Sequence, residues 1–151
     1  MRKVTLALAL SVLFLPLPAL AQKCTEESIK NDIQNPDSKN NADDVYFFSG
    51  ALEKPIVGSS APEWKKVGEK LGQERKNEKH GVPKPDRIVV SPSGDMAYSY
   101  GTPQLSFDEV STSKHIDFTA AYLSVWKVVN GSCKVAATMY QPEGEHSVAN
   151  R

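Results

Sequence analysis

Apolar and polar residues alternate most clearly over residues 116–142, near the end of the chain. Two such runs flank Asn130-Gly131, and this dipeptide between alternating apolar positions is the strongest short-range hairpin signal. A two-residue turn at this point pairs Val129 with Ser132. The pattern therefore predicts one long antiparallel hairpin that closes the domain.

The register of this hairpin predicts which side chains share a face. Counting back from the turn, Trp126 faces Val135 and Tyr122 faces Met139. One face is apolar and aromatic, with Phe118, Ala120, Tyr122, Ser124, Trp126, Val128, Cys133, Val135, Ala137 and Met139. The other face is mixed. We expect the apolar face to meet the helices, because this register sorts apolar from polar residues more cleanly than a three-residue loop with a bulge.

The preceding residues predict shorter elements with two different periods. They are a helix between a Thr25 cap and a stop at 35–37, a polar loop over 37–44, a strand over 45–49, a short strand through 56–57, a helix from Pro62 to about Lys79, and strands over 87–91 and 96–102. Trp64, Val67 and Leu71 form one apolar stripe on the second helix, and Gly68 and Gly72 beside it suggest close packing. This order predicts an α+β domain with helices on one face of a bent sheet.

The N-terminus has the three parts of a secretory signal peptide. A basic start, an apolar run over 4–20 and a small-x-small site at 19–21 predict cleavage after Ala21. An uncleaved membrane anchor and a lipoprotein are the alternatives, but prolines interrupt the apolar run, and Lys23 rather than a small residue precedes Cys24. No later run has the roughly 18 apolar residues of a membrane helix. We expect an exported protein, periplasmic or secreted, without membrane contact after cleavage.

Length and charge then limit the classes of function. Of 151 residues, removal of the signal peptide, residues 1–21, leaves 130 (151 less 21), enough for one domain with a core. We divide them into an N-terminal helical segment over 22–43, the α+β domain over 44–142 and a flexible tail over 143–151. The chain has 18 basic and 18 acidic residues, so loss of two basic residues on cleavage leaves a formal charge of −2. This balance argues against a nucleic-acid partner.

The sequence lacks motifs for cofactor or metal binding. It has no glycine-rich phosphate loop and no nucleophile elbow, and His80, His115 and His146 lack ligand spacing. We therefore expect neither a cofactor nor a metal. The charge run over 69–79 is interpreted as a solvated helix face.

Two cysteines, Cys24 and Cys133, remain in the mature chain. Exported chains meet oxidising surroundings, and a bridge across about 110 residues would stabilise the fold by about 4 kcal/mol in the chain-entropy model. The predicted register places Cys133 on the helix-facing side, and Cys24 just precedes the first helix, so a disulfide is geometrically reasonable. The alternative is a small buried thiol at Cys133 and an idle one at Cys24.

Four segments carry a family resemblance: NADDVYFFSG at 41–50, IVG at 56–58, SGDMAYSYGT at 93–102 and YLSVWKVVNGSCKV at 122–135. In this order they resemble landmarks of the SnoaL-like, ketosteroid-isomerase-related group of the nuclear transport factor 2-like superfamily. The resemblance covers about residues 42–142. It implies a cone-shaped, curved antiparallel sheet, closed like a barrel by helices on its concave face, over an apolar pocket. Members often form homodimers through the outer sheet face, and some are isomerases, cyclases or dehydratases.

The chain departs from the family pattern at three places. Cys133 stands where the hairpin often has a second tryptophan, and Thr138 stands where an aspartate often follows on the last strand. The helical region over 22–43 is also short for the family. The change at Thr138 removes the most obvious acid–base carboxylate.

Candidate site residues follow from the resemblance and from residue chemistry. Asp44 is the one acid at a matching landmark and is the candidate catalytic base, although a strand-start or cap residue is the alternative. His115 and Asp117 alternate on one strand and are interpreted as a solvated polar pair. The expected ligand-binding side chains, some of which serve equally well as core, are Trp64, Tyr98, Tyr100, Tyr122, Trp126 and Met139.

Three functions remain open. The first is an exported domain that binds a small apolar or amphipathic molecule in the cone. The second is an exported isomerase, dehydratase or hydrolase that uses Asp44 with a pocket tyrosine. The third is a protein-interaction module that uses the outer sheet face. A cavity above about 300 Å³ with an inward Asp44 would favour the enzyme, apolar walls would favour binding, and a filled cavity with an exposed apolar outer face would favour interaction.

Overall fold

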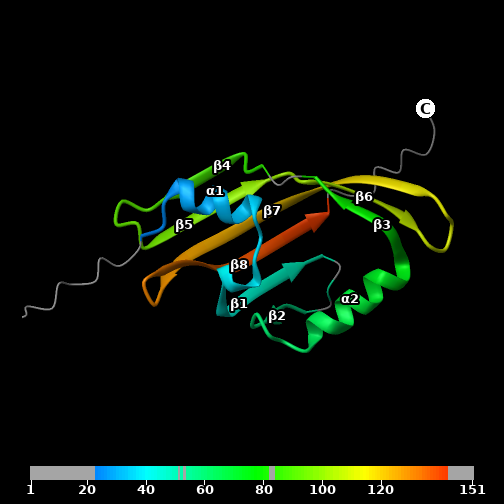
Figure 1. Cartoon of the computed structure of the whole chain (residues 1–151), viewed down its shortest axis with the longest axis horizontal. Helices are drawn as coiled ribbons and strands as arrows, with labels where there is room; N and C mark the ends of the chain where they lie inside the picture. Colours follow the sequence, from blue (N-terminus) through cyan, green and yellow to red (C-terminus); the bar gives the residue numbers. More distant parts are fainter. Residues whose placement is uncertain (1–22, 51, 53, 82–83, 143–151) are drawn as a thin grey trace, which may run out of the picture.

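The computed structural model describes residues 23–50, 52, 54–81 and 84–142. The predicted signal peptide and tail lie outside these residues. The described elements are α1 (Glu26–Gln34), η1 (Ser38–Asn40), β1 (Asn41–Ser49), β2 (Ile56–Val57), α2 (Glu63–Glu74), β3 (Arg75–His80), β4 (Arg87–Val90), β5 (Met96–Gly101), β6 (Gln104–Glu109), β7 (His115–Val129) and β8 (Ser132–Pro142) (Figure 1). Within these ranges, no helix is long and apolar enough to cross a membrane.

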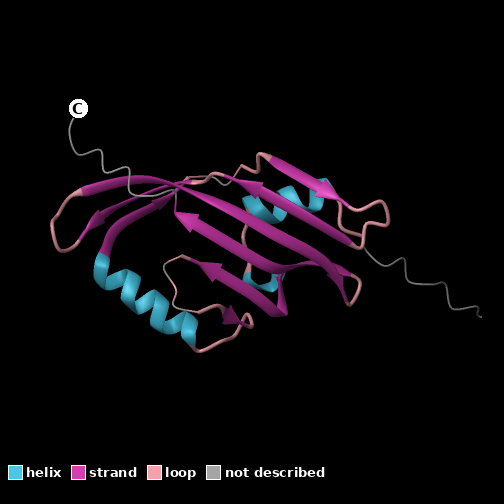
Figure 2. Cartoon of the chain, turned by 180° about the vertical axis from the view of Figure 1, so that it is seen from behind, coloured by secondary structure: helices cyan, strands magenta, loops and turns pink. Residues whose placement is uncertain are grey.

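The strands form one curved, open sheet, which the view from behind in Figure 2 also shows. Its main path through the described residues is β2-β1-β8-β7-β5-β4, and β6 pairs with both β3 and the far half of β7. The α+β class and the curved sheet are confirmed. The sheet is mixed rather than wholly antiparallel, because β1 runs parallel to β8. It is also not closed into a barrel.

The β7–β8 hairpin turns where the sequence predicts. Asn130 and Gly131 have φ values of 50° and 78°, the left-handed pair that a two-residue hairpin turn requires. Trp126 pairs with Val135 as predicted. The next pair joins Val125 to Ala137, so one residue, Ala136, is extra on β8.

This bulge reverses the faces of β8 beyond it. Tyr122 pairs with Tyr140, and the predicted pairing with Met139 is wrong. Because side chains alternate along a strand, one extra residue turns Tyr140 toward the helices and Met139 away from them. Met139 is accordingly 48% exposed on the outer face.

Helix α1 covers one end of the concave face and forms the packed core. Thr25 caps the helix with a reciprocal bond to Ser28, as a capping box. Ile29 is fully buried. It packs in one cluster with Cys24, Val45, Ala97, Trp126 and Val135. Cys24 and Cys133 form the predicted disulfide, with Cα atoms 5.0 Å apart, which fastens the start of α1 to the hairpin.

Helix α2 is shorter than predicted and packs little. It ends at Glu74, and Arg75, its C-cap, is already extended at φ −132° and ψ 142°. The predicted continuation to Lys79 is wrong, because the backbone of β3 pairs with β6, a strand the sequence pattern did not reveal. No residue of α2 is buried. A Cβ at Gly68 or Gly72 would meet no atom within 4 Å, so close packing does not explain these glycines.

The strands also begin earlier than predicted near α1. The polar residues 37–44 were expected to form a loop, but η1 and the first half of β1 occupy most of them. Asp37 caps η1 by accepting a hydrogen bond from the Lys39 backbone at 2.9 Å. Ala42 and Val45 of β1 are buried, which gives this polar segment two apolar anchors.

Candidate functional site

A cavity of about 900 Å³ lies between α2 and the concave face of the sheet. Its helix wall is the apolar stripe of Trp64, Val67 and Leu71. Its sheet wall is aromatic, with Phe47, Phe118, Tyr122, Trp126 and Tyr140. The stripe that would pack a helix onto a core therefore lines open space here.

Contacts at the two ends of α2 hold this helix over the cavity. At its start, the Trp64 indole N–H donates to the Gly58 carbonyl oxygen at 3.0 Å. The same ring meets Phe47 edge-on, with centroids 4.9 Å apart. At its end, α2 continues without a loop into β3. Figure 1 shows the helix running beside the sheet from the β2 end to the β3–β6 end.

The sheet wall is fixed by aromatic and hydroxyl contacts. Tyr140 packs between Phe47 and Tyr122, with centroid distances of 5.6 and 6.2 Å. Burial raises the pKa of Tyr140, so its hydroxyl stays protonated and can donate a hydrogen bond. Thr138, at the position of the missing family aspartate, shares a 3.0 Å hydrogen bond with Ser124.

The Tyr122 hydroxyl lies deeper, at the boundary with the packed core. It is buried, and burial is the main cause of its raised pKa, a shift that Ser99 opposes. Next to it, the Trp126 indole N–H donates to Ser99 Oγ at 3.0 Å. These two rings therefore serve both the cavity wall and the core.

A polar cluster of Arg75, Glu78 and His80 lines the cavity at β3. Glu78 Oε1 lies 3.5 Å from Arg75 Nη1 and 3.5 Å from His80 Nε2. The Arg75 guanidinium carbon also stacks 4.4 Å from the centroid of Phe107. All three side chains border the cavity.

The sequence pattern does not reveal this cluster, because the charge run over 69–79 is typical of a helix. In β3, the left-handed Asn77, with φ 54°, sits at the break in pairing with β6 and brings Glu78 and His80 onto the side of Arg75. The alternation of Glu78 and His80 was the available signal, but it is short and lies inside a charge run typical of helices.

Asp32, on α1, is a second acid at the cavity. Burial raises its pKa, and the Lys134 charge and a hydrogen bond with Asn31 oppose that shift. Asp32 was also not among the candidates from sequence, because its place at a cavity depends on how α1 packs.

Asp44, the candidate catalytic base, lies outside the cavity. Its carboxylate binds the Lys127 ammonium at 3.1 Å, and its side chain is 70% exposed. The Lys127 hydrogen bond lowers the pKa of Asp44. An inward Asp44 near a tyrosine, the geometry expected of the enzyme, is therefore not present.

The expected ligand-binding residues divide between two faces. Trp64, Tyr122 and Trp126 border the cavity. Tyr98, Tyr100 and Met139 instead lie on the outer face and are 41%, 40% and 48% exposed. For the two strand tyrosines, the buried alternation of Ala97, Ser99 and Gly101 decides the direction, because β5 turns these small residues inward.

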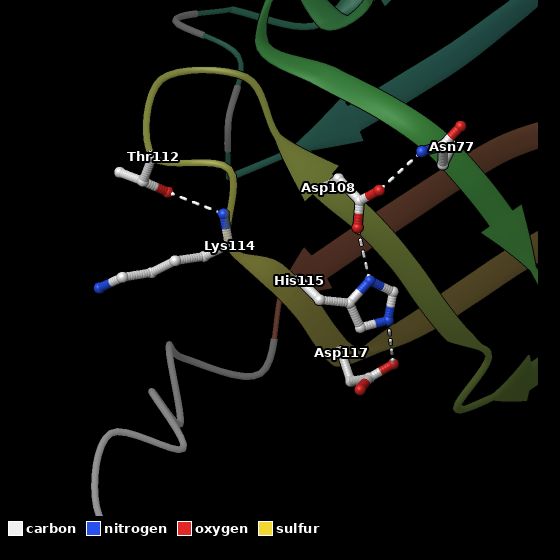
Figure 3. Close-up of polar contacts among 6 residues, drawn as sticks. All are labelled: Asn77, Asp108, Thr112, Lys114, His115 and Asp117. Atoms are coloured by element: carbon white, nitrogen blue, oxygen red, sulfur yellow. Dashed lines mark hydrogen bonds and ion pairs between the residues drawn. The ribbon is translucent and has the colours of Figure 1, made fainter.

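His115 and Asp117 form part of a wider polar array at the far ends of β6 and β7 (Figure 3). His115 Nδ1 lies 2.7 Å from Asp108 Oδ1, and Asn77 donates to Asp108 Oδ2 at 2.7 Å. The hydrogen bond with Asp108 is the main cause of the raised pKa of His115. The hydrogen bond from Asn77 is the main cause of the lowered pKa of Asp108. The array is exposed and links three strands.

No family model and no curated protein matches this sequence. Solved structures do match. A ketosteroid isomerase-like protein from Erwinia carotovora atroseptica superposes with a TM-score of 0.57 at 14% identity, over 77% of this chain and 90% of that chain. A nuclear transport factor 2-like superfamily protein from Salmonella enterica gives 0.55 at 14% identity, over 83% and 90%. Hexachlorocyclohexane dehydrochlorinase type 3 from Novosphingobium barchaimii gives 0.58 at 12% identity, over 78% and 80%.

The chain has the nuclear transport factor 2-like fold. The resemblance drawn from the four sequence segments is confirmed at the level of the fold. At these identities the likeness carries no activity from one chain to another. The chemistry of this site must therefore be argued from its own residues.

The cavity of this chain offers apolar area with polar groups at its border. Within the described ranges, no group of three His, Cys, Asp or Glu side chains is placed to hold a metal ion. Side chains that can accept or donate hydrogen bonds border it on several elements, among them Arg75, Glu78 and His80 on β3, Asp32 on α1 and Tyr140 on β8. Such an arrangement can enclose an apolar body and orient it through one polar end.

Proposed function

We propose that this protein is an exported domain that binds a small apolar or amphipathic molecule in the cavity beneath α2. The observation that carries the proposal is the cavity of about 900 Å³ between the apolar stripe of α2 and the aromatic sheet wall. This volume falls within the roughly 300–1,000 Å³ of small-molecule sites. Beyond the Trp64–Phe47 contact, apolar walls that face each other across open space lose packing, which a ligand of the same character restores.

Export rests on two further observations. Residues 1–21 carry the predicted signal peptide, and Cys24 and Cys133 form a disulfide, a bond typical of oxidising compartments. A cell fractionation that finds the chain in the cytoplasm with its first 21 residues intact would contradict this part of the proposal.

Native purification and mass spectrometry test the binding function directly. We expect a co-purifying molecule that is lost on denaturation and whose rebinding raises the melting temperature. A matched pair of variants locates it. Gly68 borders the cavity and Gly72 does not, and a side chain at either position would meet no atom within 4 Å of its Cβ.

Gly68→Phe should therefore fill the cavity and weaken binding by about tenfold or more, as expected from the loss of apolar contact. Gly72→Phe adds the same side chain to the same helix and should bind like the unaltered protein. Equal binding by all three proteins would overturn the proposal.

A homodimer through the outer sheet face is the second part of our proposal. Large apolar side chains on three neighbouring strands support it, because each is about half exposed: Met96, Tyr98, Tyr100, Leu123 and Met139. Clustered apolar exposure of this kind is typical of an interface. Sedimentation of the native protein should give a dimer, and Leu123→Lys should shift it toward monomer. A monomeric native protein at micromolar concentration would exclude this interface.

A further inference from the structure

The Arg75–Glu78–His80 cluster, which we name the β3 cluster, has hydrogen-bonding capacity that the protein does not use. Both contacts to Glu78 Oε1 are 3.5 Å long. A charge-assisted hydrogen bond from nitrogen to carboxylate is about 2.7–2.9 Å long. Among the described residues, none donates a hydrogen bond to Glu78. The Glu78 carboxylate is therefore close enough to Arg75 for the two charges to offset each other, and its oxygens can still accept hydrogen bonds.

The cluster is also held in place at the cavity border. Arg75 stacks over Phe107 at 4.4 Å and lies 5.9 Å from the centroid of Phe118, which lines the cavity. The Arg75 and Glu78 side chains are 24% and 30% exposed, so water reaches them only in part. A polar group of a bound molecule can replace that water without moving the arginine.

Charge compensation within the cluster favours an uncharged ligand. The opposite charges of Arg75 and Glu78 cancel. A ligand carboxylate would therefore be repelled by Glu78, and a ligand ammonium group would be repelled by Arg75. The acids that border the cavity elsewhere, Asp32 and Asp37, add further repulsion against an anion.

Among uncharged groups, a hydroxyl fits best. It can donate its proton to Glu78 and accept a hydrogen bond from Arg75 or His80 in the same position. A ketone only accepts, so it would leave the Glu78 carboxylate without a donor, which is costly in a partly desolvated site.

We infer that the β3 cluster binds the hydroxyl group of an otherwise apolar alcohol whose body occupies the cavity. This inference rests on the proposed function, which supplies the apolar part of the site. It assigns the ligand class, an uncharged apolar alcohol, and makes Glu78 the residue that selects it.

Calorimetric titration of the full mature chain with three ten-carbon probes tests the inference. The probes are 1-decanol, 2-decanone (the methyl ketone) and decanoate. We expect decanol to bind about tenfold more tightly than either of the other probes, because one hydrogen bond to a charged group contributes about that difference in affinity. Glu78→Gln should reduce the preference for decanol over the ketone by about tenfold, because the glutamine amide can donate to a carbonyl. The matched control is Glu69→Gln, on the exposed side of α2, which should leave the preference unchanged.

The outcomes separate this inference from the function beneath it. If no probe binds, or if Gly68→Phe leaves the binding of all three unchanged, the binding cavity itself is disproved. If the probes bind in the cavity but decanol is not preferred, or Glu78→Gln keeps the preference, only the assignment of the alcohol is overturned.

Discussion

The two ends of the concave face differ in what their helices do. Helix α1 packs on the sheet around the fully buried Ile29, and a disulfide fastens its start. Helix α2 has no buried residue and faces a cavity of about 900 Å³. Both helices are amphipathic and both carry an apolar stripe. The difference teaches that an apolar stripe predicts which side of a helix turns inward, but not whether protein or ligand fills the space it faces.

The largest effect should come from opening the packed end. We expect the double variant Cys24→Ser with Cys133→Ser to lose about 4 kcal/mol of unfolding free energy, because the bridge closes a loop with a sequence separation of 109 residues. Urea unfolding of the native protein and the double variant measures this loss of unfolding free energy. A reductant should destabilise the native protein and leave the double variant unchanged. Equal stability of the two proteins would show that the disulfide does not hold this end together.

A matched pair of truncations compares the two helices directly. Ile29→Ala should cost about 3 kcal/mol, because it leaves a cavity in a packed core. Leu71→Ala, on the α2 stripe, should cost less than about 1.5 kcal/mol in the ligand-free protein, since its side chain already borders open space. Chemical denaturation of both variants measures the difference. Similar losses would mean that α2 packs as tightly as α1.

The glycines of α2 provide a smaller and opposite effect. Gly68→Ala and Gly72→Ala should each stabilise the protein by about 0.5–1 kcal/mol, because alanine favours the helix and its Cβ meets no atom within 4 Å. Thermal unfolding followed by circular dichroism measures it. Destabilisation by either change would reveal packing on α2 that the structure does not contain.

The smallest effect concerns the exposed array at His115. Its pKa is raised from the ordinary value of 6.5, so its contribution to stability is complete below that value and is lost as the pH rises through the raised pKa. The pKa of Asp108 is lowered, so its contribution is complete above its ordinary value of 3.8 and is lost only in stronger acid. His115→Gln should therefore lower the melting temperature slightly near pH 5 and hardly at all near pH 9. A loss of melting temperature in His115→Gln that becomes larger as the pH rises would contradict this prediction.

The sequence predicted the parts of the fold that depend on local patterns. The hairpin turn follows from the left-handed preference of Asn130-Gly131, and the first helix follows from the Thr25 cap. The pairing of Cys24 with Cys133 followed from the hairpin register near the turn. These features were accessible because neighbouring residues determine them.

The site was less accessible, because it depends on pairing between distant segments. The strand β3 forms from a charged, helix-like segment only because β6 offers its backbone. The β3 cluster was missed for that reason. Asp44 matched a family landmark in sequence, but the pairing shift between Asn41 and Tyr46 of β1 leaves it on the outside, bound to Lys127.

The bulge at Ala136 decides which side chains of β8 reach the cavity. Deleting Ala136 would remove the bulge and leave Tyr140 opposite Tyr122, because the residues beyond the bulge would keep their partners on β7. If Ala136 were instead paired without a bulge, Met139 would lie opposite Tyr122, and a thioether would replace the aromatic hydroxyl at the cavity. The wall of the cavity therefore depends on where β8 bulges as well as on which residues β8 contains.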